Sequence, residues 1–154
     1  MENRDAARFV FGIASLLESQ GANPYRVRAY RRAALGLLNL PTPAVEYVNG
    51  DGELALPWLG PRLRRKLGEL VLLGRMQFQD ELLAQLPGPF RELLAVPGVG
   101  PKTAERLIRE LGIHGVLELA IAAREQRLQT LRGIGPRRER QFGQGAEALV
   151  AQAA

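Results

Sequence analysis

One short pattern occurs three times in this chain, and it restricts the fold more than any other feature. The shared pattern is apolar-x-Gly-apolar-Gly-Pro-basic, and the copies end in Gly60-Pro61-Arg62, Gly100-Pro101-Lys102 and Gly135-Pro136-Arg137. In the first copy Trp58 stands where the others have Gly98 and Gly133. Two glycines around one apolar residue allow a tight turn, and proline is favoured at the first position of a helix. The repeat therefore predicts three helical hairpins.

The segments outside the hairpin turns have the periodicity of helices. Apolar residues recur at helical spacing over residues 6–17 and again over 63–71. Glycine and proline separate the stretches, and no segment shows the sustained alternation of a half-buried strand. We expect an all-α fold without a sheet. It should consist of two small helical subdomains, residues 1–80 with the first hairpin and residues 81–154 with the other two.

The chemistry of the hairpins points to phosphate. We expect the central residue of each turn (Leu59, Val99 or Ile134) to point into the core. The helix that begins at the proline has N–H groups without intrahelical partners, and they lie at the positive end of its dipole. Because glycine places no side chain in front of them, a phosphate can approach these amides, and the basic residue adds charge. Such contacts do not depend on base sequence.

Composition agrees with a polyanionic partner. The chain has 21 basic against 16 acidic residues, a formal net charge of +5, and only Lys66 and Lys102 are lysine. It has no cysteine and one histidine, His114, which excludes disulfides, thiolate catalysis and metal sites built from several histidines. No apolar run approaches the roughly 18 residues of a membrane span. We expect no membrane partner and a cytoplasmic, nucleoid-associated protein.

The second copy resembles the helix-hairpin-helix DNA-binding motif throughout, from Gly98 to Ala104. The third copy matches at its turn but lacks the small residue after it, and Trp58 makes the first copy degenerate. The alternative is a plain turn between two helices, which three copies with basic residues disfavour. The expected DNA-binding residues of the hairpins are Gly60, Arg62, Gly98, Val99, Gly100, Lys102, Thr103, Gly133, Ile134, Gly135, Arg137 and Arg138.

The order of the segments resembles the N-terminal part of family X DNA polymerases, especially the bacterial and archaeal type. The most specific element is residues 23–34, Asn-Pro-Tyr-Arg-Val-Arg-Ala-Tyr-Arg-Arg-Ala-Ala, followed by the first hairpin, Gly74-Arg75 and the other hairpins. In that family the first half is a helical domain that binds the 5′ phosphate of a gap and in some members is a deoxyribose-phosphate lyase. The second half resembles the region that grips the primer-side duplex.

The resemblance covers almost the whole chain but includes neither the palm nor the phosphoesterase domain of those polymerases. The palm holds two metal ions on paired carboxylates. Here the aspartates are Asp5, Asp51 and Asp80, which are scattered along the chain. We expect no nucleotidyl-transfer site in these 154 residues. A stand-alone relative and a fragment of a longer polymerase both fit this sequence.

The resemblance implies a candidate lyase at Lys66, the position of the family's Schiff-base lysine. Such a lysine attacks the ring-opened sugar, and β-elimination releases the 5′ phosphate. Tyr30 and Arg26 match residues near the phosphate pocket, and Arg31 is close in sequence. Neighbouring cations should lower the pKa of the amine and hold a phosphate; they are Arg62, Arg64 and Arg65.

Some residues depart from the family pattern and weaken this prediction. Trp58 lies just before the site, Arg65 stands where animal members have an acid, and Leu54 replaces a basic residue of their phosphate pocket. Lys66 would then be a surface cation that only binds phosphate. A lysine here still favours the lyase, because arginine stays protonated and cannot form the Schiff base.

Two further features have two interpretations each. The stretch with Arg26, Arg28, Arg31, Arg32, Tyr25 and Tyr30 either binds DNA or is a solvated helix face. Trp58 either stacks on a base or sugar end or fills the core.

The sequence predicts a sequence-independent DNA-binding module of DNA repair. The alternatives are the lyase and a module that binds a polymerase or nuclease. DNA is the expected partner, with other repair proteins as further partners. No cofactor is required, although the resemblance implies a monovalent cation, Na⁺ or K⁺, at a hairpin when DNA is bound.

Overall fold

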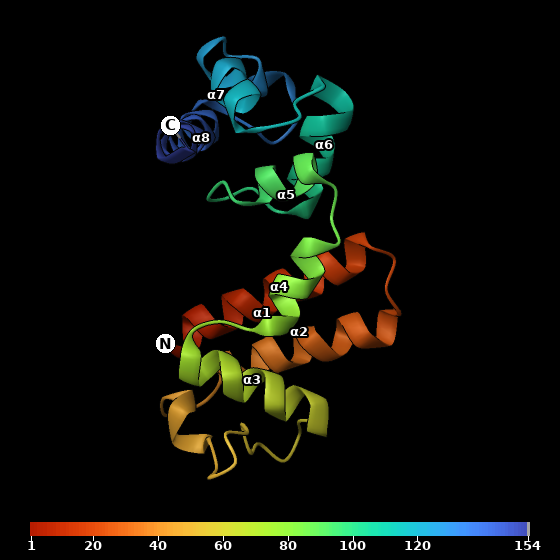
Figure 1. Cartoon of the computed structure of the whole chain (residues 1–154), viewed down its shortest axis with the longest axis vertical. Helices are drawn as coiled ribbons and strands as arrows, with labels where there is room; N and C mark the ends of the chain where they lie inside the picture. The colour runs from red at the N-terminus through yellow and green to blue at the C-terminus, as the bar shows by residue number, and fades with distance from the viewer. Residues whose placement is uncertain (154) are drawn as a thin grey trace. The chain divides into compact units, whose positions relative to one another are not determined.

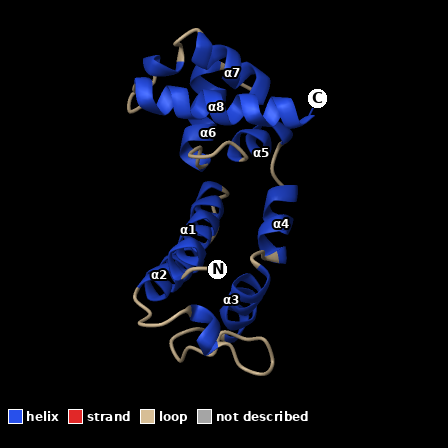
Figure 2. Cartoon of the chain, turned by 90° about the vertical axis from the view of Figure 1, so that its left-hand side faces the viewer, coloured by secondary structure: helices blue, strands red, loops and turns tan. Residues whose placement is uncertain are grey.

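The computed structural model describes residues 1–153, which form α-helices, two short 3-10 helices and connecting turns (Figures 1 and 2). Within these residues no strand forms, and an isolated bridge joins Val48 and Leu54. The prediction of an all-α fold is confirmed. The chain divides into two compact units, Met1–Gln85 and the residues from Leu86 onward.

The first unit consists of α1 (Asn3–Ser19), α2 (Pro24–Leu38), the 3-10 helix η1 (Ala44–Tyr47), α3 (Pro61–Leu73) and α4 (Gln77–Ala84). Helix α2 begins as its sequence predicts, because Asn23 Oδ1 accepts a hydrogen bond from the Tyr25 amide at 2.9 Å and Pro24 occupies the first turn. Helix α3 ends at Gly74, whose φ of 72° is readily adopted only by glycine.

The core of the first unit lies between α1, α2 and α3. Small residues at the contact between α1 and α2 allow these two helices to pack closely, and Ala6, Ala14 and Ala34 are fully buried. Larger side chains fill the space toward α3, and each contributes about 1.5–3 kcal/mol by its burial. They are Val10, Ile13, Leu17, Leu37, Leu67 and Leu70.

Helix α4 belongs to the first unit because Phe78 and Leu82 pack against its core. The boundary that we expected after residue 80 would cut this helix, and the two units divide after Gln85 instead.

The second unit consists of α5 (Gly88–Leu94), α6 (Pro101–Leu111), α7 (Val116–Arg124), the 3-10 helix η2 (Leu128–Thr130) and α8 (Pro136–Ala153). Gly143 lets α8 approach α7, because a Cβ at this position would lie 2.9 Å from the Cβ of Ala123. The core residues around this contact include Leu93, Leu107, Ile113, Leu119, Leu128 and Phe142.

Candidate functional site

The three sequence repeats fold into turns that are closed by the same hydrogen bond. In each, the amide of the central apolar residue donates to the carbonyl three residues earlier. The pairs are Leu59 to Leu56 at 3.1 Å, Val99 to Val96 at 3.0 Å and Ile134 to Leu131 at 3.1 Å. All six side chains are buried. The central residues therefore anchor the hairpins in the core, as the repeat predicts.

The two glycines of a repeat differ in conformation. Gly98 and Gly133 have φ values of 88° and 90°, which fit the third position of a type II turn and are unfavourable for residues with a Cβ. The second glycine is extended, with φ of −74° at Gly60 and −93° at Gly100. Unusual backbone angles are thus confined to the first glycine of the pair.

The second glycine leaves the start of the following helix uncovered. Among the described residues, a Cβ at Gly60, Gly100 or Gly135 would meet no atom within 4 Å apart from its own chain neighbours. The first helical hydrogen bonds come from Arg64, Ala104 and Glu139, which donate to these three glycine carbonyls at 3.0, 2.9 and 3.0 Å. The two amides after each proline precede these donors and have no intrahelical acceptor. Each hairpin therefore has two N–H groups without an intrahelical partner next to the open space at its second glycine.

The basic residue after each proline is exposed. Within residues 1–153, Arg62, Lys102 and Arg137 form no ion pair, whereas some of the arginines elsewhere in both units do. The paired arginines are Arg31, Arg75, Arg106, Arg109, Arg124 and Arg127. Uncompensated positive charge therefore coincides with the free amides at all three hairpins.

Lys66 lies at a second site, to which α2, α3 and α4 each contribute. Its Nζ donates a hydrogen bond to the Tyr30 hydroxyl at 3.3 Å and lies 3.8 Å from the ring centroid of Phe78. The rings of Tyr30 and Phe78 stack with centroids 5.9 Å apart. The guanidinium carbon of Arg26 lies 5.0 Å from the Phe78 centroid. The ring of Phe78 thus holds two cations next to a buried hydroxyl.

The surroundings change the acidity of both polar groups. Burial lowers the pKa of Lys66, and the charges of Arg26, Arg62 and Arg65 lower it further, while Glu81 opposes them. Burial raises the pKa of Tyr30, and Arg26 partly opposes this shift. The amine is therefore closer to its neutral, nucleophilic form than an ordinary lysine, and the phenol keeps its proton.

Known families match both parts of the chain. Residues 1–76 match the helix-hairpin-helix domain family, and residues 90–141 match the family described as the SAM-like helix-hairpin-helix tandem. Both segments are helix-hairpin-helix domains. The first contains the Trp58 hairpin and Lys66, and the second contains the two hairpins that keep both glycines.

A bacterial polymerase shares this region. The DNA polymerase/3′-5′ exonuclease PolX of Bacillus subtilis (strain 168) is 30% identical over 139 residues, which are 90% of this chain. The chain spans about a quarter (24%) of the length of that polymerase. The resemblance to the N-terminal part of a family X DNA polymerase is thereby confirmed.

The first helix-hairpin-helix domain closes its turn without a left-handed residue. Among the described residues, Gln126 is the non-glycine residue with a positive φ, so Trp58 does not copy the backbone of Gly98 and Gly133. The tip of its indole lies against α2 at Gly36, where an added Cβ would collide with the ring. The residue is nevertheless 48% exposed. Trp58 thus neither fills the core nor stands free.

Two arginines donate hydrogen bonds to backbone carbonyls of the hairpin turns, which the sequence did not indicate. Arg64 Nε donates to the Leu59 carbonyl at 3.0 Å, and Arg138 donates to the Gly133 carbonyl at 2.9 Å. The Arg138 guanidinium carbon also lies 5.1 Å from the centroid of the Phe142 ring. Arg138, which we predicted to bind DNA, therefore also supports its own turn.

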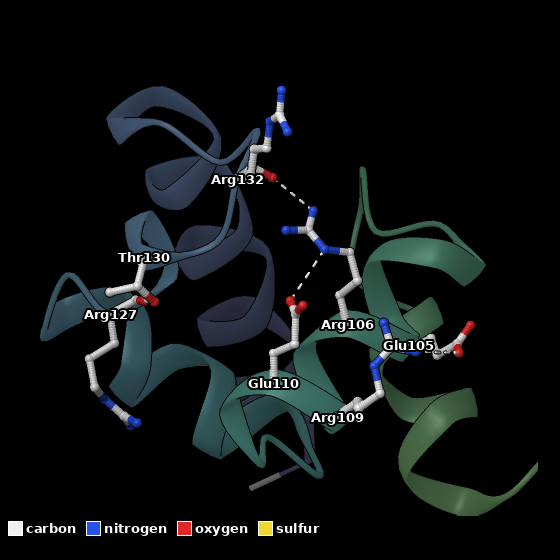
Figure 3. Close-up of polar contacts among 7 residues, drawn as sticks. All are labelled: Glu105, Arg106, Arg109, Glu110, Arg127, Thr130 and Arg132. Atoms are coloured by element: carbon white, nitrogen blue, oxygen red, sulfur yellow. Dashed lines mark hydrogen bonds and ion pairs between the residues drawn. The ribbon is translucent and has the colours of Figure 1, made fainter.

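Arg106 connects the two hairpins of the second unit through noncovalent contacts (Figure 3). Its Nε pairs with Glu110 at 3.3 Å along α6, and its Nη1 donates to the Arg132 carbonyl in the third hairpin at 2.8 Å. The helix that begins at the second hairpin is therefore joined directly to the third.

Glu139 explains the missing small residue of the third hairpin. It occupies the position of Ala104 in the second copy and is buried. Its carboxylate accepts hydrogen bonds from the Leu128 amide at 3.0 Å and from the Gln129 amide and side chain at 3.3 and 2.6 Å. This side chain thus holds the start of η2 against α8.

The basic-aromatic stretch at residues 25–32 separates into different roles. Arg26 joins the Lys66 site, whereas Arg31 pairs with Glu18 of α1 at 2.8 Å. Arg28 lies over the ring of Tyr25, 5.4 Å from its centroid. Of the predicted arginines here, the structure brings only Arg26 next to Lys66.

Residues 1–153 contain no group of three or more histidine, aspartate or glutamate side chains placed to hold a metal ion. None of their helices combines the length and apolarity needed to cross a bilayer.

Proposed function

We propose that this chain binds the phosphate backbone of gapped, nicked or duplex DNA independently of base sequence, and that it acts in DNA repair. One observation carries the proposal. At all three hairpins an uncovered glycine, free helix amides and an unpaired cation lie together. The match to helix-hairpin-helix domains and the similarity to the N-terminal part of a bacterial DNA polymerase support the same partner.

The physical basis is the same at each hairpin. A phosphate oxygen accepts hydrogen bonds from the two free amides, the helix dipole favours its charge, and the basic side chain adds an ionic contact. The protein groups contact no base edge, so these contacts position the duplex without reading it.

The test is equilibrium binding of the full chain to labelled DNA. Duplexes of equal length and unrelated sequence should bind with equal affinity. If three to five phosphates are engaged, the slope of log K against log salt should be roughly −3 to −5, because each neutralised phosphate contributes about 0.9. A slope near zero, or no binding at low salt, would overturn the proposal.

A second candidate function is a deoxyribose-phosphate lyase at Lys66. The hydrogen bond to Tyr30 and the lowered pKa of the amine favour it over a surface cation. The amine adds to the aldehyde carbon of the ring-opened sugar and loses water to give a Schiff base. Loss of a proton from the carbon next to the imine to water then breaks the carbon–oxygen bond to the phosphate on the following carbon, and the phosphate leaves. Water hydrolyses the remaining Schiff base, which releases the unsaturated sugar and restores the amine. Arg26 and Arg62 would hold that phosphate.

A further inference from the structure

We propose that Trp58 makes the first hairpin a stacking platform for an unpaired base. This inference rests on the proposed DNA binding and adds a structural preference that the phosphate contacts alone do not supply. The other two hairpins have glycine at this position, so we assign the preference to the first hairpin.

The tryptophan is not needed to form the turn. The Leu59 amide still donates to the Leu56 carbonyl at 3.1 Å, as the matching residues do in the glycine-containing hairpins. Leu56 and Leu59 on either side are buried at 4% and 5% exposure, so the turn is anchored without the indole. The side chain at Trp58 is therefore an addition to a turn that closes by its backbone.

The end of the indole packs against Gly36, but about half of the residue is exposed to solvent. Gly36 on α2 leaves the space that the end of the ring occupies, since a Cβ there would collide with Cη2, Cζ2 and Cζ3. This contact restricts the rotation of the ring, so little conformational entropy is lost when a ligand stacks on it. Yet 48% of the residue remains exposed, and the indole nitrogen has no hydrogen-bond acceptor within residues 1–153.

The chemistry around the indole suits a nucleotide. Trp58 precedes the open Gly60 surface and the free amides of α3 by a few residues, and Arg62 adds an exposed, unpaired cation. A phosphate on those amides would bring its sugar and base toward the indole. Bases inside a duplex already stack on their neighbours, whereas a base at a gap or in a single strand can stack on an aromatic ring. We therefore assign an unpaired base as the ligand.

Trp58 is the only tryptophan of the chain, so its own fluorescence reports on the proposed contact without a label. The full chain is titrated with gapped, single-stranded and intact duplex DNA of matched length. We expect quenching with the gapped and single-stranded DNA and almost none with the duplex. Fluorescence anisotropy of labelled DNA, measured in parallel, establishes that all three are bound.

Two variants test whether the indole sets the preference. Trp58→Gly gives the first repeat the glycine that the other two have at this position and should lower the ratio of gapped to duplex affinity about tenfold, because it removes the aromatic face on which the base stacks. Trp58→Phe keeps an aromatic face and should retain most of the ratio. Thermal unfolding followed by circular dichroism identifies variants that do not fold.

The outcomes separate this inference from the proposed function. If the anisotropy of none of the three labelled DNAs changes when the protein is added, DNA binding itself is refuted. Binding with unchanged wild-type fluorescence would overturn the role of Trp58 alone, and so would a folded Trp58→Gly chain with the original gap preference. If Trp58→Gly does not fold, the fluorescence of the wild-type chain decides: quenching with gapped and single-stranded DNA but not with bound duplex supports the role of Trp58, and equal or absent quenching overturns it.

Discussion

The Nζ atom of Lys66 lies 3.3 Å from the hydroxyl of Tyr30, which comes from a different helix and is almost completely buried. The ring of Phe78 contacts both residues from a third helix. An amine held in this way, with its pKa lowered by burial and by Arg26, is more readily neutral than an ordinary lysine amine, and the neutral form is the one that a nucleophile needs. A solvated surface lysine has neither the fixed partner nor the shift.

Replacing Lys66 should remove the proposed lyase chemistry. Borohydride reduces a Schiff base to a stable covalent adduct, so trapping on a 5′-deoxyribose-phosphate substrate measures its formation. We expect Lys66→Ala and Lys66→Arg to reduce trapping to background while Lys102→Arg leaves it unchanged. Equal trapping by the Lys66 variants would move the amine to Lys102 or to the N-terminus, and no wild-type adduct would end the lyase hypothesis.

The pH profile of trapping should depend on Arg26. Its positive charge disfavours the ammonium form of Lys66 and so lowers the pKa of that amine. In Arg26→Gln the pKa rises, less amine is neutral at a given pH, and the profile normalised to its plateau should move to higher pH. Arg31→Gln is the matched control, because Arg31 pairs with Glu18. If the normalised profiles of both variants coincide with that of the wild type, the charge of Arg26 does not lower the pKa of Lys66.

The two glycines of the second hairpin should respond differently to substitution. Gly98→Ala places a Cβ at a φ of 88° and 3.1 Å from the Phe142 ring, so it should destabilise the fold by about 1–2 kcal/mol. Gly100→Asp and Gly100→Asn meet open space, and both residues favour the helix N-cap, so stability should hold. Urea unfolding measures these differences.

DNA binding should separate the two Gly100 variants. The aspartate places a negative charge in front of the free amides, whereas asparagine has almost the same size and no charge. We expect affinity to fall from wild type to Gly100→Asn and to fall furthest in Gly100→Asp. Wild-type affinity in a folded Gly100→Asp chain would rule out phosphate binding at this hairpin.

The cation after each hairpin should contribute to the salt dependence of binding. Lys102→Gln removes one phosphate contact and should make the log–log salt slope shallower by about 0.9. Arg109→Gln lies on the same helix but removes a cation that already pairs with Glu105 at 3.1 Å, so its slope should stay close to the wild-type value. An equal change for both variants would indicate only a loss of net charge.

The hairpins could be predicted because the interactions that form them are local. Turn, buried central residue, proline and helix start all lie within about seven residues, and the pattern is repeated. The helix start at Pro24 was predictable for the same reason, since Asn23 and Pro24 are adjacent.

The supports of the site could not be predicted in this way. Each of these supporting contacts joins a side chain to a different element or to a preceding turn: Phe78 to Lys66, Arg64 to the Leu59 carbonyl, and Glu139 to the Leu128 amide. The spacing of residues in a single sequence does not show which side chains will meet. Arg31 illustrates the same limit. Its position beside Arg26 suggested a phosphate ligand, but its side chain extends to Glu18.

The sequence by itself determined an all-α fold with three hairpins in which a glycine and a proline precede a helix, because turn and capping energies act over a few neighbouring residues. Tertiary structure decided which cations stay unpaired, why Trp58 is seated on Gly36 and half exposed, and why Lys66 differs from Lys102. Those properties depend on burial and on distances between charges from separate helices, and only the packing of the folded units sets them.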